Sequence, residues 1–304
     1  CGANARIHGH EAGPRRRFQP VSSHPRPAAA HVAASPREAR VTVRTLAARK
    51  RRGEKLTMLT AYDFAFARIF DAAGIDLLLV GDSLGNVVQG QDTTLPVTLD
   101  EVVYHTRLVA RGARRAMVIG DMPFGSYQVS AEDAVRSAIR LVKEGGAQAV
   151  KLEGGVTAAE AIARIARAEI PVIGHVGLTP QAIHRMGGFR VQGRTDGERA
   201  RVLADAQAVE EAGAVAVVLE GMPAELAADV TRKLAIPTLG IGAGPDCDGQ
   251  VLVMHDMLGL NDWTPSFVKQ FADLGVATAR AARAFAEEVA GGKFPAEEHC
   301  YKAR

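Results

Sequence analysis

The feature that most constrains the fold of this chain is a short apolar segment that ends in an ionisable residue and occurs five times. Such segments cannot expose either face to water, which is typical of strands buried within a parallel sheet. In proteins with parallel sheets, the active site lies at the carboxyl ends of the strands. The repeat therefore predicts an enzyme whose site is built from strand ends. The five segments are LLLVGD (77–82), MVIGD (117–121), AVKLE (149–153), PVIGH (171–175) and VVLE (217–220).

Helical patterns alternate with these segments and predict an α/β protein, a (β/α)8 barrel at residues 41–304. A short helix at 41–52 is expected to cover the bottom of the barrel, and an amphipathic last helix is expected at 265–290. Strand eight is the least distinct, and its candidate is 251–254. Two connections, 86–98 and 177–197, are long enough to act as lids over a site.

Residues 1–40 differ in composition from the rest of the chain and lack apolar periodicity. Residues 1–55 carry thirteen Lys and Arg against three Glu, whereas the remainder carries 24 Lys and Arg against 31 Asp and Glu. A segment that buries so little apolar surface cannot offset the entropy of ordering, so residues 1–40 are expected to be a disordered basic extension. An organelle transit peptide and a nucleic-acid-binding tail are the functional alternatives to a tail without function.

Cysteine usage and hydropathy exclude several classes of protein. Cys1, Cys247 and Cys300 are far apart and form no CxxC spacing, so neither a zinc site nor a disulfide framework is indicated. Cys247 has acidic neighbours on both sides and is expected to be exposed and unreactive. The cysteine pattern fits a reducing compartment. No apolar run is long enough for a membrane span, and the N-terminus has no apolar h-region, which argues against secretion.

Acidic residues gather at three neighbouring strand ends. Lys151 and Glu153 are two residues apart in one strand and therefore face the same side, while Asp82 and Asp121 end the two preceding strands. Closely packed carboxylates repel each other unless a cation lies among them, and oxygen ligands without cysteine select a hard ion. The pattern predicts a Mg²⁺ site at Asp82, Asp121 and Glu153. Such an ion can bind a 2-oxo acid and stabilise the enolate formed by loss of its C3 proton.

The remaining strand ends supply candidates for proton transfer and substrate binding. Glu220 ends an apolar strand and is the expected general base. His175 is expected to hold a substrate oxygen, Ser83 to donate to the substrate carboxylate, and Lys151 to neutralise that carboxylate. Each residue alone has a structural alternative, because a strand-end carboxylate can be solvated and a histidine can be a buried structural residue. Their coincidence at one end of one sheet favours the functional interpretation.

Eight sequence blocks, in the same order, resemble the ketopantoate hydroxymethyltransferase family. The likeness runs from about Val41 to Tyr301. The blocks are MLTAYDFAFARIFDAAGIDLLLVGDSLG (58–85), VQGQDTTLPVTLDEVVYHT (88–106), GDMPFGSY (120–127), VKLEGG (150–155), GHVGLTPQ (174–181), GGFRVQGR (187–194), VLEGMP (218–223) and GIGAGPDCDGQVLVMHDMLG (240–259).

The resemblance implies a cytoplasmic, decameric (β/α)8 enzyme of pantothenate synthesis. It would transfer a one-carbon unit from 5,10-methylenetetrahydrofolate to 3-methyl-2-oxobutanoate and form 2-dehydropantoate. By matching position, Asp82 and Asp121 would hold Mg²⁺ with Glu153 as the third carboxylate of the metal site. Lys151 and Ser83, with both aspartates, would contact the oxo acid. Glu220 would accept the proton.

Two other functions are weighed against this one. A Mg²⁺-dependent carbon–carbon lyase of the isocitrate lyase-like barrel group shares a GDS-type strand end and acidic metal ligands, but its usual KKCGH-like loop is missing from this sequence. A basic-tailed nucleic-acid-binding module would need a basic patch on the folded body. The acidic balance of residues 56–304 argues against that module, so small-molecule substrates, without nucleic acid or membrane, are the expected partners.

Overall fold

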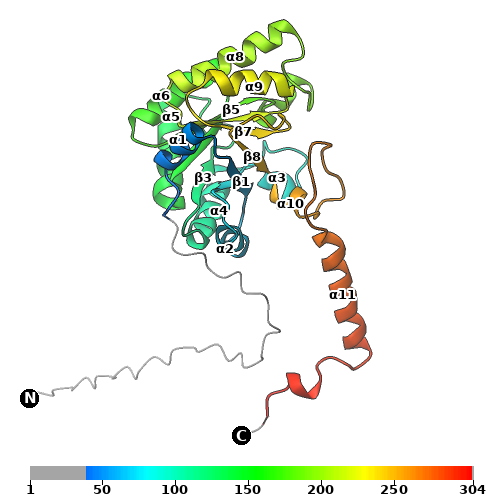
Figure 1. Cartoon of the computed structure of the whole chain (residues 1–304). Coiled ribbons are helices and arrows are strands. Elements are labelled where there is room, and N and C mark those ends of the chain that lie inside the picture. Colours follow the sequence, from blue (N-terminus) through cyan, green and yellow to red (C-terminus); the bar gives the residue numbers. More distant parts are fainter. Residues whose placement is uncertain (1–38, 303–304) are drawn as a thin grey trace, which may run out of the picture. The chain divides into compact units, whose positions relative to one another are not determined.

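The structure, a computed structural model, describes residues 39–302. Its centre is a closed barrel of eight parallel strands in which each strand pairs with the next and β8 pairs with β1. Helices lie around the strands, as Figure 1 shows. The (β/α)8 prediction is confirmed. The strands are β1 (Leu56–Thr60), β2 (Leu77–Val80), β3 (Met117–Asp121), β4 (Ala149–Glu153), β5 (Val172–Gly177), β6 (Ala216–Glu220), β7 (Thr238–Ile241) and β8 (Gly249–Leu252).

Local side-chain caps fix where several helices begin. Thr98 and Thr195 each form a capping box with the glutamate three residues later, and Asp63 accepts hydrogen bonds from two backbone amides of the helix that follows it. Ser130 accepts from the Asp133 amide. The helices are α1 (Val43–Arg52), α2 (Phe64–Ala72), α3 (Leu84–Val87), α4 (Leu99–Gly112), α5 (Ala131–Arg140), α6 (Ala159–Arg167), α7 (Ile183–Met186), α8 (Asp196–Glu211), α9 (Ala224–Lys233), α10 (Met254–Met257) and α11 (Leu274–Ala290).

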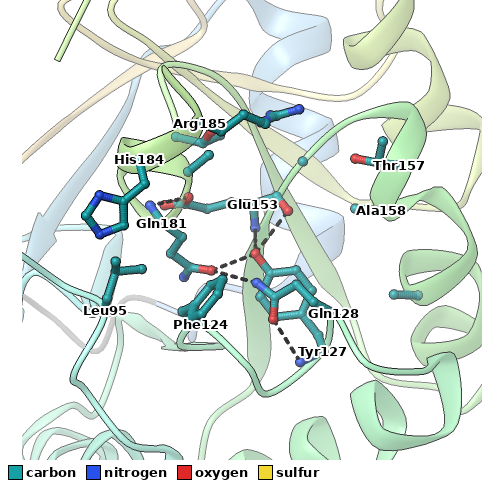
Figure 2. A pocket seen from close by; sticks show the side chains of 14 residues that line it. Leu95, Phe124, Tyr127, Gln128, Glu153, Thr157, Ala158, Gln181, His184 and Arg185 are labelled. Carbon is teal, nitrogen blue, oxygen red and sulfur yellow. Dashed lines mark hydrogen bonds between the residues drawn. The ribbon is translucent and has the colours of Figure 1, made fainter. Parts of the chain in front are cut away.

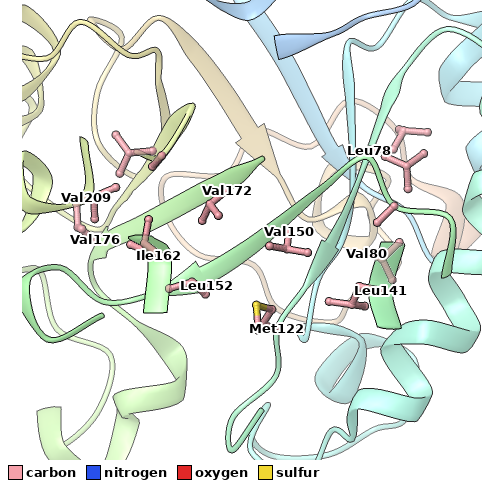
Figure 3. Packing of buried hydrophobic residues seen from close by; sticks show 14 of the residues in the cluster. Leu78, Val80, Met122, Leu141, Val150, Leu152, Ile162, Val172, Val176 and Val209 are labelled. Carbon is pink, nitrogen blue, oxygen red and sulfur yellow. The ribbon is translucent and has the colours of Figure 1, made fainter. Parts of the chain in front are cut away.

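Alternate residues of each strand enter one of two apolar layers. Outward residues such as Val80, Val150 and Leu152 pack with helix residues such as Leu141 and Ile162, and Figure 3 shows part of this layer. A second, inner layer consists of strand side chains together with Val41 and Leu46 at the start of the chain's folded part. Its members on the strands are Leu56, Met58, Leu77, Leu79, Met117, Ile119, Ala149, Ile173, Ala216, Val218, Leu239 and Val251. Helix α1 therefore covers the N-terminal end of the barrel, as predicted.

The C-terminal region differs from the prediction in two places. Strand β8 begins at Gly249, which pairs with both β1 and β7, and it ends before Met254, whose amide donates to Thr60 Oγ1 and begins α10. The last helix begins at Leu274 because Asp273 caps it and the Leu274 amide bonds to the Leu258 carbonyl. An eighth strand is therefore present where the sequence indicated it, but its bounds are 249–252 and not 251–254. The last helix ends at 290 as expected, whereas its expected start at 265 was wrong. Long-range hydrogen bonds set both boundaries.

Several other expectations can be compared with the structure. Short helices occur at both long connections: α3 ends just inside the first, and α7 lies within the second. Cys247 is fully buried against the outer layer, so its expected exposure was wrong. The expected disordered extension at 1–40 falls almost entirely outside the described residues, and the proposed domain boundary stays a prediction. None of the described helices is long and apolar enough to cross a membrane.

Candidate active site

Strand geometry brings the ionisable strand ends together at the C-terminal mouth of the barrel. On β3, Asp121 is two residues beyond the inward-facing Ile119, and the same alternation turns Lys151, Glu153, His175 and Glu220 inward from β4, β5 and β6. The first four of the five side chains are buried. Glu220 keeps 20% of its side-chain surface exposed. Water and small molecules can therefore reach the cluster on the Glu220 side.

Asp82, Asp121 and Lys151 form the first half of this cluster. Asp121 and Lys151 are register partners on adjacent strands, and their side chains form an ion pair with Nζ 2.9 Å from Oδ1. Asp82 lies in the turn just after β2, and its backbone amide donates to Asp121 Oδ2 at 3.0 Å. Two buried aspartates are thus adjacent, and one ammonium group faces them.

Glu153, His175 and Glu220 form the second half. The His175 ring lies between two carboxylates, with Nδ1 3.4 Å from Glu153 Oε1 and Nε2 3.1 Å from Glu220 Oε2. Lys151 Nζ is also 3.4 Å from His175 Nδ1, which connects the two halves. The structure thus brings Glu220 into contact with the buried cluster through His175.

Because the ionisable residues at the mouth are buried, it is unfavourable for all of them to be charged at the same time. Burial, followed by the charges of Asp121 and Glu153, raises the pKa of Asp82 well above its usual range. Burial also raises the pKa of Asp121, even though Lys151 opposes this effect. Burial and Lys151 lower the pKa of His175, but hydrogen bonds with Glu153 and Glu220 outweigh them and raise it to about 9. Negative charge at Asp82 is therefore only partly compensated by the protein itself.

The side chains around Asp82 fit a hard cation that has only one or two protein ligands. Within residues 39–302, no three or more His, Cys, Asp and Glu side chains are close enough together to hold a metal ion. Asp82 and Asp121 are nevertheless neighbours, and Asp121 Oδ1 accepts no well-oriented hydrogen bond. Mg²⁺ in proteins commonly has only one or two carboxylate ligands and completes its shell with water and substrate. The donor set of Asp82 and Asp121 fits that pattern, whereas Glu153 is directed toward His175 and Gln181.

Ser83 is engaged with a residue that the sequence did not single out. Its Oγ lies 2.9 Å from the hydroxyl of Tyr62, which is 3% exposed. Burial, the largest cause, raises the pKa of the Tyr62 phenol, so this hydroxyl stays protonated and can keep Ser83 oriented. Ser83 is next to Asp82 in the chain, so the pair lies at the edge of the carboxylate cluster.

Gln181 is a second residue that sequence reasoning missed, and it joins the two halves of the cluster. Its side-chain Nε2 donates to Asp82 Oδ2 at 2.9 Å, and its backbone amide donates to Glu153 Oε2 at 3.0 Å. The Tyr127 hydroxyl donates to Gln181 Oε1 at 2.7 Å and thereby fixes which way the amide points (Figure 2). The sequence held two signals for it: Gln181 lies in a long loop expected to be functional, and it ends the block GHVGLTPQ (174–181).

A cavity of about 610 Å³ adjoins this cluster, and Figure 2 shows its lining. Glu153 and Gln181 belong both to the cluster and to the cavity wall, whereas Asp82, Asp121, Lys151, His175 and Glu220 do not line it. The cavity is formed by residues that follow β2, β3, β4 and β5. It therefore lies at the same end of the barrel as the charged residues.

Comparison with known sequences shows one consistent family. The family model described as "Ketopantoate hydroxymethyltransferase" matches residues 40–297. A curated 3-methyl-2-oxobutanoate hydroxymethyltransferase from Desulforapulum autotrophicum is 58% identical over 86% of this chain and 99% of its own length. One of the same name from Frankia alni is also 58% identical, over 88% of each chain.

Solved structures with much lower sequence identity share the barrel. A phosphonopyruvate hydrolase, in complex with oxalate and Mg²⁺, aligns with a TM-score of 0.56 at 14% identity and covers 86% of this chain and 92% of its own. A 2,3-dimethylmalate lyase, described as a member of the PEP mutase/isocitrate lyase superfamily, aligns with a TM-score of 0.54 at 20% identity, over 85% of this chain and 91% of its own. At these identities the likeness shows the fold alone.

Proposed function

This chain belongs to the ketopantoate hydroxymethyltransferase family, and we propose on that basis that it converts 3-methyl-2-oxobutanoate to 2-dehydropantoate in pantothenate synthesis. The one-carbon donor in this proposal is 5,10-methylenetetrahydrofolate. The C3–H bond of the oxo acid breaks, and a bond forms between C3 and the methylene carbon. Water supplies the hydroxyl group, and tetrahydrofolate leaves with the protons that balance the reaction.

The observation that carries the proposal is the convergence of Glu220 with a buried acid–ammonium cluster at one barrel mouth. Glu220 is the partly exposed member and has His175 against its Oε2, so it is placed to accept the C3 proton. Lys151 presents an ammonium group to the substrate carboxylate, and Ser83 presents a hydroxyl. His175, held between Glu153 and Glu220, orients the base and can donate to a substrate oxygen.

Asp82 and Asp121 would hold Mg²⁺, with Glu153 as the third carboxylate proposed for the metal site. When bound, the ion would supply positive charge next to the keto oxygen as negative charge develops there. The raised pKa of Asp82 supports this assignment, because its first causes, burial and the neighbouring carboxylates Asp121 and Glu153, are relieved by a cation.

Hydrogen exchange at C3 tests this proposal without requiring the folate. The oxo acid is incubated with the protein in D2O, and the C3 proton is followed by NMR with Mg²⁺ or with EDTA. We expect exchange that needs Mg²⁺ and that falls by a factor on the order of 10²–10⁴ in Glu220→Gln. Glu225→Gln, a matched change at an exposed position in α9, should keep the wild-type rate. Exchange that is indifferent to both EDTA and Glu220→Gln would exclude the proposed mechanism.

Addition of 5,10-methylenetetrahydrofolate then distinguishes the transferase from its alternative. The barrel shared with 2,3-dimethylmalate lyase keeps a carbon–carbon lyase as the second candidate. The transferase forms 2-dehydropantoate from the oxo acid only when the donor is present. A lyase would instead cleave 2,3-dimethylmalate in the absence of the donor, and detection of that cleavage would favour the alternative.

The proposed working form is a cytoplasmic homo-oligomer, a decamer by family resemblance, that uses small-molecule substrates without nucleic acid or membrane. Support comes from α11, in which no residue is buried within one chain. Val276, Phe285 and Val289 on this helix are 60%, 59% and 47% exposed. Exposed apolar side chains of this number are typical of a surface covered by another subunit. Light scattering of the purified protein measures the assembly size, and a monomer would contradict this part of the proposal.

A further inference from the structure

The cavity beside the cluster is too large for the oxo acid alone. At about 610 Å³ it lies within the range of about 300–1,000 Å³ that holds drug-sized ligands. The small oxo acid is already accounted for by Ser83 and Lys151, neither of which lines the cavity. The cavity therefore has room for a second, larger ligand at the same barrel mouth.

One wall of the cavity offers an aromatic surface. Phe124 lies in the loop after β3 and is 51% exposed, and it stacks on no other aromatic ring among residues 39–302. Leu95, Ala158 and Ala161 extend the apolar lining. Flat heteroaromatic rings stack favourably on such a surface, because both the buried area and the ring quadrupoles contribute.

The opposite wall carries positive charge. His184 and Arg185 of α7 line the cavity and are exposed, as Figure 2 shows at the top of the site. In the part of the chain that the structure describes, neither residue forms an ion pair with an acidic side chain. The only acidic residue of the lining is Glu153, which is buried and faces His175 instead. A cationic wall without internal partners is complementary to carboxylates of a ligand.

The cavity also reaches the reacting end of the site. Gln181 lines it with Glu153, and the Gln181 amide is hydrogen-bonded to Asp82. A ligand that fills the cavity therefore ends beside Glu153 and one side chain away from Asp82. A ligand with a flat ring at one end and carboxylates at the other matches both walls.

From these features we propose that this cavity binds the one-carbon donor, with its pteridine ring against Phe124 and its glutamate carboxylates at Arg185. The inference rests on the proposed function, because it takes the identity of the donor from it. Arg185 recognises the anionic tail by charge, so donors with additional glutamates bind more tightly. Phe124 holds the ring end next to Gln181 and Glu153.

Two variants test the assignment, with a third as the matched control. Phe124→Ala removes the stacking surface, and Arg185→Glu reverses the charge at the tail. Arg68→Glu makes the same charge change on the exposed face of α2, outside the cavity lining. We expect the KM for 5,10-methylenetetrahydrofolate to rise on the order of 10-fold in each cavity variant. The KM for the oxo acid and the folate-independent C3 exchange rate should stay within about twofold of wild type.

Calorimetry with tetrahydrofolate and its pentaglutamate measures binding without turnover. Arg185→Glu should lose more affinity for the pentaglutamate than for the monoglutamate, and added salt should weaken only the Arg185-dependent part. Unchanged donor KM and unchanged tetrahydrofolate affinity in both cavity variants would overturn the assignment. If the wild type binds tetrahydrofolate in an Arg185-dependent way but forms no 2-dehydropantoate, the cavity assignment stands and the proposed function fails.

Discussion

Asp76 and Asp82 flank the same strand, β2, and both are buried, at 2% and 4% exposed, but their surroundings are opposite. At the N-terminal end of the barrel, Asp76 accepts from Arg49 Nη1 at 2.8 Å and from Arg115 Nη2 at 2.7 Å. It also accepts from the amide and hydroxyl of Thr57. At the C-terminal end, Asp82 receives one side-chain hydrogen bond, from Gln181, and faces two other carboxylates.

A second acidic residue at the N-terminal end repeats the pattern of Asp76. Asp248 pairs with Lys50 of α1 at 2.7 Å and accepts from the amide of Thr238 at 2.9 Å. Both pairs tie α1 to the barrel. The contrast with Asp82 teaches that burial of an acid is not by itself a functional sign, because compensation decides its role. Compensated charge at one end stabilises the fold, and the only partly compensated charge at the other end is where we propose that a cation binds.

Asp82→Asn should give the largest separation between activity and stability. The substitution removes a charge that the folded protein disfavours, yet an amide can still accept from Gln181. We expect turnover to fall by a factor on the order of 10²–10³. In metal-free protein at neutral pH, the free energy of unfolding should stay equal or increase, as measured by urea denaturation.

The sign of that stability effect follows from the direction of the pKa shift. A raised pKa means that the folded protein binds the Asp82 proton more tightly than the unfolded chain does. The penalty of ionised Asp82 is therefore absent below the ordinary Asp pKa of about 3.9, grows as pH rises from that value to the raised folded pKa, and is complete above it. A destabilised Asp82→Asn protein at neutral pH would show that Asp82, like Asp76, is a structural acid.

Asp76→Asn should produce the inverse result. It removes the carboxylate that accepts from two guanidinium groups while leaving the mouth untouched. Loss of a buried, hydrogen-bonded ion pair costs about 3 kcal/mol, so the midpoint of urea unfolding should fall clearly. Turnover per folded molecule should remain within about twofold of wild type. A comparable loss of turnover without loss of stability would erase the distinction between the two ends.

His175, at the C-terminal end of the barrel, should make the free energy of unfolding depend on pH. Its pKa is raised to about 9, so its charged form stabilises the folded state, fully below the unfolded value of about 6.5 and progressively less as pH rises through 9. At about 1.4 kcal/mol for each pKa unit, metal-free protein should lose about 3 kcal/mol of unfolding free energy across that interval. His175→Gln should lack this component in parallel urea titrations. Identical pH profiles for the two proteins would mean that the pKa of His175 is the same in the folded and unfolded states, and not raised on folding.

Much of the barrel and the mouth could be predicted because strand periodicity carries the information locally. Residues two apart on a strand share a face, which placed Lys151 with Glu153, and equivalent positions on neighbouring strands added Asp121, His175 and Glu220. Asp82 lies beyond the end of β2, so strand alternation does not place it, but the GDS sequence at this strand end identified it as a candidate. These features depend on segments of about five residues and need no knowledge of the rest of the chain.

What could not be predicted depends on contacts between distant segments. The start of α11 is fixed by hydrogen bonds from Phe271 and Leu274 to carbonyls near α10, and an amphipathic pattern alone extended the helix back to Pro265. Cys247 is buried because it packs into the outer layer, a contact that its acidic sequence neighbours do not indicate. Gln181 acts through Asp82, which is 99 residues away in the chain, so no local pattern reports that contact.

Gln181→Leu should give the smallest effect and the sharpest test of how the mouth is held together. Leucine fills a similar volume but cannot donate to Asp82 or accept from Tyr127, so the two halves of the cluster lose their side-chain link. Loss of a residue that orients metal carboxylates typically costs 10- to 100-fold, and here we expect about 10-fold in Mn²⁺ affinity, measured by electron paramagnetic resonance. Because the backbone amide still donates to Glu153, the fold should persist.

Gln128→Leu is the matched control, since Gln128 donates to the same Gln181 oxygen at 3.2 Å but does not reach Asp82. It should retain wild-type Mn²⁺ affinity. The C3 exchange rate at saturating Mn²⁺ separates orientation from simple loss of binding: recovery toward wild type in Gln181→Leu means that the amide acts by positioning Asp82 for the ion. Equal losses of Mn²⁺ affinity in both variants would show that the contacts of Gln181 with the cavity wall matter, and not its hydrogen bond to Asp82. The Asp82 carboxylate would then be oriented by its own turn after β2.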